Sequence, residues 1–345
     1  MTESTVRATA PLRISFVGGG TDFPHYYERN GGAVLSATID HCAHVDVTPR
    51  EDRHVTIRSL DLGHLVEYHL GEDPVYDGVM DLPKAAIARI GSRAGLDVDI
   101  ASDAPPGSGL GGSSALVTAC VGALAALAEL PLSTFEVARL AYAIERDDLQ
   151  IAGGWQDQYA AAFGGFNLLE FTSDGVTVTP VVLDENALSE LRSHLLLCYT
   201  GRVRTDLGLI DTQIRMYREG REETIVGMKQ LHEMAYEMRD ALEAGDLASL
   251  GGLLGQAYES KKRMNPHIAE GTPIERLMDA AHEAGAAGGK ICGAGGGGYL
   301  LLACRPDRQP AVRAALETLG GQLADFSFRS RGVEARLGDR IWRPA

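Results

Sequence analysis

The chain has 345 residues and a formal net charge of −15, because 47 Asp and Glu outnumber 32 Lys and Arg. Its 45% of hydrophobic and 23% of charged residues are ordinary for a soluble globular protein, and its length suits one large domain or two of common size. The acidic balance excludes a broad nucleic-acid-binding surface, which needs an excess of Lys and Arg.

The first third of the chain is predicted to be mostly antiparallel sheet, because its apolar residues alternate within β-rich segments. The expected strands are 6–17, 34–50, 54–60 and 64–70. A helix over 81–94 and a strand over 96–104 follow, and that strand ends at the turn Pro105–Gly107. Residues 113–129 are apolar nearly all round, which predicts a buried helix, and 133–150 predict another helix.

The composition changes near residue 185, where we expect a boundary between two lobes, 1–185 and 186–345. A hairpin over 166–183 precedes this boundary. The segments expected after it are helices over 205–246, 247–264, 272–285 and 310–319, and strands over 298–305 and 326–337. Blocks of strands and blocks of helices, without regular β-α-β alternation, predict an α+β architecture.

Glycine accounts for 41 residues, well above its usual share of about 7%, and the glycines are clustered. In 105–115 (PPGSGLGGSSA) a strand passes through a glycine-rich loop into a helix. Backbone N–H groups can turn toward an anion there, so the segment predicts a phosphate-binding loop, with a ligand-free tight turn as the alternative. Three of its glycines fit a dinucleotide-binding pattern, but the acidic residue about 20 positions on is Glu129, inside the predicted buried helix. Ser113 replaces the lysine of a Walker A motif, which excludes that motif too.

Two other glycine clusters lie nearer the ends of the chain. Residues 290–300 (KICGAGGGGYL) place a run of glycines directly before an apolar strand. Such a segment is costly to order, by up to about 1 kcal/mol per glycine relative to alanine, unless something approaches its backbone closely. Residues 11–24 (PLRISFVGGGTDFP) end a strand in three glycines, and there Asp22 is either a functional residue or only the N-cap of the next helix.

Glu145 lies on a predicted helix, and Asp157 follows a Gly-Gly turn twelve residues later. The two carboxylates can share one site only if the chain turns back between them. An acidic pair close to a phosphate-binding loop is a natural site for Mg²⁺ and for a group that orients or receives a hydroxyl proton. Taken singly, each residue is typical of a surface carboxylate.

Three segments together resemble, in order, the motifs of the GHMP kinase superfamily, the group of galactokinase, homoserine kinase and mevalonate kinase. The segments are APLRISFVGGGTD, PPGSGLGGSSA and KICGAGGGGYL, and the match runs from residue 10 to residue 301. The resemblance implies a two-lobed fold, with a mixed five-stranded N-terminal lobe related to ribosomal S5 domain 2 and a ferredoxin-like C-terminal lobe. The active site would lie between the lobes.

The resemblance also implies roles for single residues. Asp157 corresponds to the catalytic aspartate and Arg13 to its basic neighbour, while Glu145 and the Ser113 hydroxyl would bind Mg²⁺. The residues implied to hold the ATP phosphates are Pro106, Gly107, Ser108, Gly109, Leu110, Gly111, Gly112, Ser113 and Ser114. The expected substrate-binding residues are Gly19, Gly20, Thr21, Asp22, Arg202, Arg204, Lys261, Arg263, Gly295 and Gly296.

Within the superfamily, the ending GGGTDFP, the stretch Tyr199–Arg204 and the run Lys261–Pro266 resemble kinases of D-glycero-D-manno-heptose 7-phosphate. Kinase domains that act on fucose share GGGTD. A substrate with a phosphate at its far end needs local cations in so acidic a chain. Arg202, Arg204 and the basic residues at 261–263 are the candidates, although each alone is also typical of a solvated charge.

The resemblance therefore implies an ATP- and Mg²⁺-dependent sugar-1-kinase that converts D-glycero-D-manno-heptose 7-phosphate to the 1,7-bisphosphate, on the route to a GDP-linked heptose. Two alternatives stay open: a kinase for an unphosphorylated sugar such as L-fucose, and a catalytically silent sugar and ATP sensor on the same fold. We expect a monomer or homodimer with small-molecule partners and neither nucleic acid nor membrane. Five widely spaced cysteines and the lack of a leader-like or membrane-spanning pattern predict a cytoplasmic protein.

Overall fold

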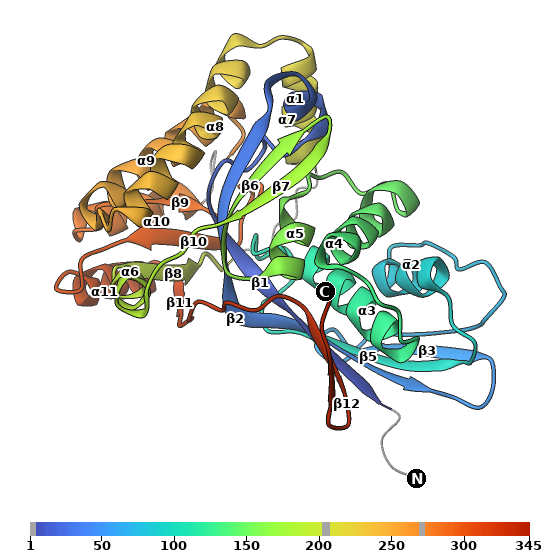
Figure 1. Ribbon diagram of the computed structural model, residues 1–345. Helices are drawn as coiled ribbons and strands as arrows, with labels where there is room; N and C mark the ends of the chain where they lie inside the picture. Colours follow the sequence, from blue (N-terminus) through green and yellow to red (C-terminus); the bar gives the residue numbers. More distant parts are fainter. Residues whose placement is uncertain (1–4, 202–207, 269–272) are drawn as a thin grey trace.

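A computed structural model describes residues 5–201, 208–268 and 273–345 of the chain (Figure 1). The long strands β1 (Val6–Val17) and β2 (Gly32–Pro49) form the middle of a mixed sheet, in the order β13-β12-β1-β2-β5-β3-β4, and β6 and β7 extend it along β2. The other strands of this sheet are β3 (His54–Ser59), β4 (Leu65–His69), β5 (Leu96–Ser102), β6 (Phe166–Thr172), β7 (Gly175–Pro180), β12 (Glu334–Leu337) and β13 (Arg340–Trp342).

The first sheet differs from the sequence prediction in two respects. It is not purely antiparallel, because β3 and β5 pair in parallel, as the mixed sheet of the resembled family implies. The last strands of the chain, β12 and β13, join it at the edge of β1, in antiparallel pairing from Val6 to Thr9. Residues 334–342 therefore lie with the first sheet, and the boundary at residue 185 stays a prediction about where the lobes divide.

The second sheet is smaller and antiparallel, in the order β11-β8-β10-β9. Its strands are β8 (Leu195–Tyr199), β9 (Gly288–Ile291), β10 (Tyr299–Ala303) and β11 (Gln322–Ala324). Figure 1 shows α6 (Glu185–Ser193) and α11 (Gln309–Thr318) beside this sheet, and the antiparallel pair α8 (Glu222–Glu243) and α9 (Leu247–Met264) above it. The architecture is thus α+β with two sheets, as the sequence predicts.

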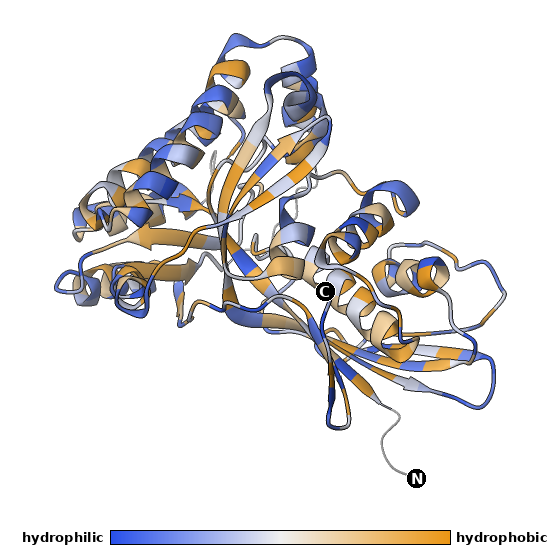
Figure 2. Cartoon of the chain, in the orientation of Figure 1, coloured by the Kyte–Doolittle hydropathy of each residue, from blue (hydrophilic) through white to orange (hydrophobic). Residues whose placement is uncertain are grey.

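The helices of the first half cover one face of the first sheet. They are α2 (Asp81–Ile90), α3 (Gly112–Leu127), α4 (Thr134–Ala143) and α5 (Gln156–Phe163), and α1 (Pro24–Asn30) lies apart from them, near α7 (Gly208–Arg218). Nearly every residue of α3 from Ser114 to Ala126 is buried, which confirms the predicted core helix. In Figure 2, α3 is hydrophobic along its length, whereas α8 and α9 mix hydrophilic and hydrophobic residues, as expected of helices with one solvated face.

Three predicted element boundaries are wrong. The pattern over 205–246 forms two helices, because the chain turns at Gly220, whose φ of +72° ends α7. The helix expected over 133–150 ends at Ala143 and continues as one π-helical turn, Ile144–Asp148. The strand expected over 326–337 begins only at Glu334. Of the residues that the structure describes, no helix is long and apolar enough to cross a lipid bilayer.

The glycine-rich loops at 105–112 and 292–298 pack directly against each other. The backbone N–H of Tyr299 donates to the carbonyl of Ser108 at 3.0 Å. A Cβ atom on Gly298 would lie 2.2 Å from that same carbonyl oxygen, and one on Gly109 would lie 2.7 Å from the carbonyl oxygen of Cys292. The sequence predicts that something approaches the backbone of residues 290–300 closely. In the structure, the loop at 105–112 makes this approach.

The packing of these two loops leads to a prediction about the stability of the protein. We expect Gly298→Ala to lower the free energy of unfolding by about 1 to 3 kcal/mol, because the new methyl group overlaps backbone atoms at a φ of +93°. Gly252→Ala is the matched control: Gly252 is an exposed helical residue of α9 with nothing within 4 Å of an added Cβ, so this change should stabilise by about 0.5 to 1 kcal/mol. Urea unfolding of both variants measures the difference, and equal stabilities would contradict the packing described.

Candidate active site

A cavity of about 690 Å³ lies between the loops and helices that connect the two sheets. It is bounded by the end of β1, the loop at 105–112, the turn before α5, parts of α7 and α9, and the loop that follows β9. The sequence-predicted site residues that line it are Arg13, Gly19, Gly20, Asp22, Pro106, Gly107, Ser108, Gly109, Gly111, Gly112, Ser113, Ser114, Asp157 and Lys261. Most of the residues that the motifs single out thus share one cavity.

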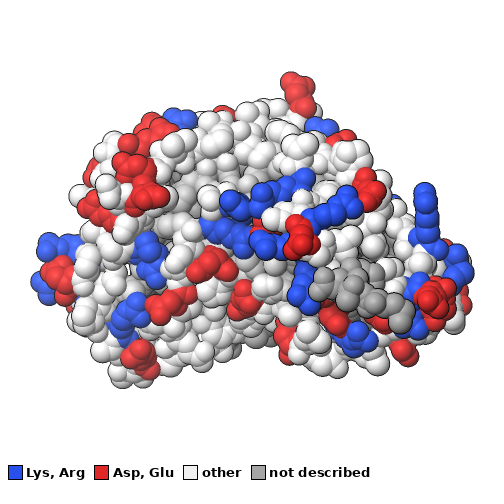
Figure 3. All heavy atoms as spheres, turned by 60° about the horizontal axis from the view of Figure 1, so that its bottom comes forward, with Lys and Arg blue, Asp and Glu red and all other residues white. Residues whose placement is uncertain are grey.

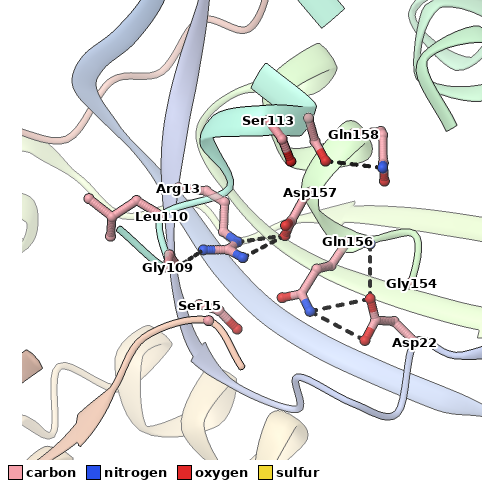
Figure 4. A network of polar contacts seen from close by, with 12 residues as sticks. Arg13, Ser15, Asp22, Gly109, Leu110, Ser113, Gly154, Gln156, Asp157 and Gln158 are labelled. Atoms are coloured by element: carbon pink, nitrogen blue, oxygen red, sulfur yellow. Dashed lines mark hydrogen bonds and ion pairs between the residues drawn. The ribbon is translucent and has the colours of Figure 1, made fainter. Parts of the chain in front are cut away.

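A buried ion pair between Arg13 and Asp157 lies at the centre of this site (Figure 4). Arg13 Nε donates to Asp157 Oδ1 at 2.8 Å, and Nη2 lies 2.6 Å from the same oxygen. Nη1 donates to the carbonyl of Gly109 at 2.6 Å. The Arg13 side chain is 5% exposed and that of Asp157 is 24% exposed, so the carboxylate is the part of the pair that a ligand can reach.

The two oxygens of Asp157 differ in their surroundings. Oδ1 is bound by the guanidinium, whereas Oδ2 receives no hydrogen bond from the residues that the structure describes. Asp157 lies in the first turn of α5, where the helix dipole favours a negative charge. The arrangement leaves one carboxylate oxygen available to accept a hydroxyl proton from a bound molecule.

Arg13 is brought inward by an irregularity of β1. The register of β1 against β2 shifts between Pro11 and Arg13, and such bulges redirect side chains next to functional sites. The backbone N–H of Arg13 also donates to the carbonyl of Leu110 at 2.9 Å, which fixes the strand against the glycine-rich loop. Arg13 is therefore a buried residue of the site, although it lies on a strand.

Asp22 is not the N-cap of α1, because Phe23 takes that position and makes no side-chain cap. Its carboxylate instead accepts from the Gly20 N–H at 3.0 Å, from the Gln156 N–H at 3.2 Å and from the Gln156 Nε2 amide at 3.2 and 3.3 Å. Burial, and next the negative charge of Asp157, raise the pKa of Asp22 above its usual value. A Cβ atom on Gly154 would lie 2.0 Å from Asp22 Oδ2, so the Gly-Gly turn allows this close approach.

Glu145 is fully buried on the π-helical turn, a feature that is frequent at functional sites. Its carboxylate accepts from Ser113 Oγ at 3.1 Å, from Ser114 Oγ at 2.6 Å and from the amide of Gln158. The chain does turn back between Glu145 and Asp157, as the sequence requires, but Glu145 lies behind the two serines rather than in the cavity wall. The two carboxylates thus flank the start of α3 from different sides.

The phosphate-binding prediction concerns the start of α3. Gly111 is the N-cap in a left-handed conformation, with φ +74°, and the helix begins at Gly112 with its N-terminus at the cavity. Free N–H groups and the helix dipole make such an end favourable for an anion. Leu110 is the exception among the predicted loop residues, because it is fully buried in the core and contributes only its backbone.

Several of the predicted substrate-binding residues do not line the cavity, and others lie outside the described residues. Arg202 and Arg204 lie outside the described residues. Arg263 faces away from the cavity and pairs with Glu223 at 3.1 Å. The Thr21 hydroxyl donates to backbone carbonyls of Gly18 and Ala33, which is a structural role.

The glycines predicted to bind substrate, Gly295 and Gly296, are not among the residues that line the cavity in the described parts of the chain. A Cβ atom on Gly295 would lie 2.7 Å from the side chain of Ile268, which fits close packing. Lys261 does line the cavity, and its Nζ donates to the carbonyl of Gly293.

Basic side chains also gather on the surface, around Glu334 on β12. Arg329, Arg336 and Arg343 each lie within 4 Å of its carboxylate, and Figure 3 shows a group of Lys and Arg on the face turned forward. None of these residues lines the cavity. Any anion bound in the cavity is therefore met by the cavity's own cations.

Lys290 is a cavity residue that the sequence analysis missed. It is 3% exposed, and its Nζ donates to the carbonyl of Ser15 at 2.6 Å. Burial, with a smaller contribution from the nearby Arg13 guanidinium, lowers the pKa of Lys290 to about 8. The only signal in the sequence is a lysine one residue before Ile291 and Cys292, ahead of the glycine run.

The chain was compared with known proteins. Residues 79–165 match the GHMP kinases N terminal domain and residues 238–322 match the GHMP kinases C terminal domain. A D-glycero-alpha-D-manno-heptose 7-phosphate kinase of Campylobacter jejuni is 36% identical over 337 residues, which cover 96% of this chain and 98% of that one. An L-fucokinase/L-fucose-1-P guanylyltransferase of Bacteroides fragilis is 29% identical over 98% of this chain and 38% of its own.

The crystal structure of a D-glycero-D-manno-heptose 1-phosphate kinase from Bacteroides thetaiotaomicron has a TM-score of 0.80 to this chain and 32% sequence identity. The superposition covers 96% of this chain and 98% of that one. The similarity therefore extends over both sheets and over the cavity between them.

The buried lysine predicts a pH dependence of stability. Because the pKa of Lys290 is lower in the folded protein than its usual 10.5, the unfolded chain binds more protons between pH 8 and pH 10.5, and stability rises with pH there. Relative to Lys290→Met, the wild-type protein should gain up to about 3 kcal/mol of unfolding free energy across this window. Urea unfolding of both proteins at several pH values tests this, and parallel pH profiles would refute it.

Proposed function

The chain belongs to the GHMP kinase family, and we propose that it is an ATP-dependent kinase for the anomeric hydroxyl of D-glycero-α-D-manno-heptose 7-phosphate. The observation that supports this best is the Asp157 carboxylate, which is bound by Arg13 on one oxygen and leaves the other available in the cavity. The 36% identity with the Campylobacter jejuni heptose 7-phosphate kinase, over nearly the full length of both chains, supports the choice of sugar.

In this proposal, Asp157 orients the acceptor hydroxyl and takes its proton as the bond to phosphorus forms. Arg13 holds the carboxylate in place and stabilises negative charge near the transferred group, from a position that is 5% exposed and already fixed by Gly109. The N-terminus of α3 and the loop before it hold the ATP phosphates. The acceptor hydroxyl and the transferred phosphate of ATP then meet between the glycine-rich loop and α5.

Mg²⁺ fits the chemistry of the residues at the start of α3. The described residues hold no cluster of three or more His, Cys, Asp or Glu side chains suited to a metal ion. Mg²⁺ bound to a nucleotide needs only one or two protein oxygens beside the phosphates. The Ser113 hydroxyl and the Glu145 carboxylate, 3.1 Å apart, are such hard oxygen donors, and we propose that they hold the ion, which would neutralise phosphate charge.

The phosphate at the far end of the sugar needs cations of the cavity. Lys261 is the described candidate, since it lines the cavity from α9. We retain Arg202 and Arg204 as predictions, and we do not retain Arg263, because it pairs with Glu223 away from the cavity.

An unphosphorylated sugar is the second candidate substrate. The relative with L-fucokinase activity in its name, 29% identical over 98% of this chain, favours it. The third possibility, a silent sensor, is disfavoured by the intact pair of Arg13 and Asp157, which sugar binding alone does not need.

A substrate panel tests the proposal. ADP release is measured with ATP and Mg²⁺ against D-glycero-D-manno-heptose 7-phosphate, the free heptose, L-fucose, mannose and galactose. We expect kcat/KM for the heptose 7-phosphate to exceed that for each free sugar by at least about a hundredfold, because only a substrate that carries the phosphate can make charge-assisted contacts with cations of the cavity such as Lys261. Preference for a free sugar would refute the choice of substrate, and no turnover with any of them would favour the sensor.

The role of Asp157 predicts the effect of one substitution. Asp157→Asn keeps the shape of the side chain but removes the proton acceptor, so kcat should fall about 100- to 10,000-fold with the fold intact. Asp147→Asn is the control, because Asp147 is an exposed carboxylate on the π-helical turn and should leave kcat within about twofold. Near-normal turnover by Asp157→Asn would exclude its role as acceptor.

A further inference from the structure

Two glutamine side chains that line the cavity each have an amide atom without a hydrogen-bond partner among the described residues. They are Oε1 of Gln156, which begins α5, and Nε2 of Gln213, in the middle of α7. Both atoms are buried. Nε of Arg146 is a third such atom among the described lining residues. Buried polar atoms are nearly always paired, so unpaired ones in a single ligand cavity point to a missing partner.

The orientation of the Gln156 amide is fixed by Asp22. Its Nε2 lies 3.3 and 3.2 Å from the two carboxylate oxygens, so the nitrogen faces Asp22 and the oxygen faces away (Figure 4). The Asp22 carboxylate already accepts from Gly20 and from both nitrogens of Gln156. Asp22 therefore acts on the cavity mainly by holding Gln156.

Gln213, on α7, lies against the turn that follows β1. Its side chain is 5% exposed, and a Cβ atom on Gly20 would lie 2.8 Å from its Nε2. A Cβ atom on the preceding residue, Gly19, would lie 3.8 Å from Oε1 of Gln156. The two unpaired atoms thus lie along neighbouring residues of the turn after β1.

The unpaired atoms are complementary in chemistry. Gln156 Oε1 can only accept a hydrogen bond, and Gln213 Nε2 can only donate one. A hydroxyl group does both at once, whereas a phosphate or carboxylate oxygen can pair only with the donor. The pair is suited to an alcohol group of a sugar.

We propose that Gln156 and Gln213 bind one hydroxyl of the sugar between them, other than the anomeric hydroxyl at Asp157, and that Gln213 is a specificity-determining residue. In this account, Asp22 is a positioning residue that acts through Gln156. The inference rests on the proposed function only in that the acceptor is a sugar, and it does not depend on which sugar that is.

The test measures sugar binding without nucleotide, by calorimetry, for the panel sugar that the wild-type protein phosphorylates fastest and for its monodeoxy analogues. Wild-type protein should bind one analogue about tenfold more weakly than the parent sugar. Gln213→Met keeps the size of the side chain but has no amide, and it should bind the parent sugar about tenfold more weakly while no longer discriminating against that analogue. The KM for ATP should change much less than the sugar affinity.

Gln256→Met, on the exposed face of α9 away from the cavity, is the matched control and should bind every sugar as the wild type does. If Gln213→Met fails to fold by circular dichroism, Gln213→Glu replaces it; this variant keeps the shape but puts an acceptor where the donor stood, and the same loss is expected.

Three outcomes separate this inference from the proposed function. The inference alone would be overturned if the Gln213 variants bound the sugar as tightly as the wild type does. It would also be overturned if their affinities for the parent sugar and for every analogue fell by the same factor. A free sugar as the best substrate, with the expected pattern among its analogues, would overturn the choice of heptose phosphate alone. Failure of the wild type to bind any sugar of the panel would overturn both.

Discussion

The buried guanidinium of Arg13 is the constraint on which the site depends. A charge that is 5% exposed must be paired, and its partners come from two segments outside β1: the carbonyl of Gly109 in the glycine-rich loop, and Asp157 on α5. The bulge in β1 and the left-handed glycines of the loop are what let these segments meet. The ion pair therefore positions the Asp157 carboxylate, and the contact with Gly109 fixes the loop beside it at the same time.

Much of this arrangement could be predicted from the sequence, because it rests on local motifs. The loop at 105–115 and the core helix after it follow from short segments whose glycines and serines have few other uses. The pairing of Arg13 with Asp157, 144 positions apart in the sequence, is implied only by the family resemblance. The predicted boundaries failed where a local signal was weak. Gly220 is a single residue within a long amphipathic pattern, and the π-helical turn at Glu145 differs from an α-helix only in that its backbone hydrogen bonds span one residue more.

The rest of the site could not be predicted, because it depends on which segments meet across the cavity. Gln156, Gln213 and Lys290 are ordinary residues in their own segments and become notable only when burial and missing partners are known. Arg263 is the opposite case. Its positive charge predicted contact with the substrate, but in the structure it pairs with Glu223 on the neighbouring helix. Gly293 and Gly298 have a structural explanation, since they pack against the glycine-rich loop at 105–112.

The central claim is that the cavity presents an anomeric hydroxyl of a sugar phosphate to the free oxygen of Asp157. Phosphorus NMR of the reaction of ATP with D-glycero-D-manno-heptose 7-phosphate tests it most directly, because the position of the new phosphate is read from its coupling to the sugar protons. The account predicts a sugar bisphosphate whose new phosphate is coupled to the anomeric proton alone. A product phosphorylated at any other hydroxyl, or release of inorganic phosphate without a bisphosphate, would contradict it.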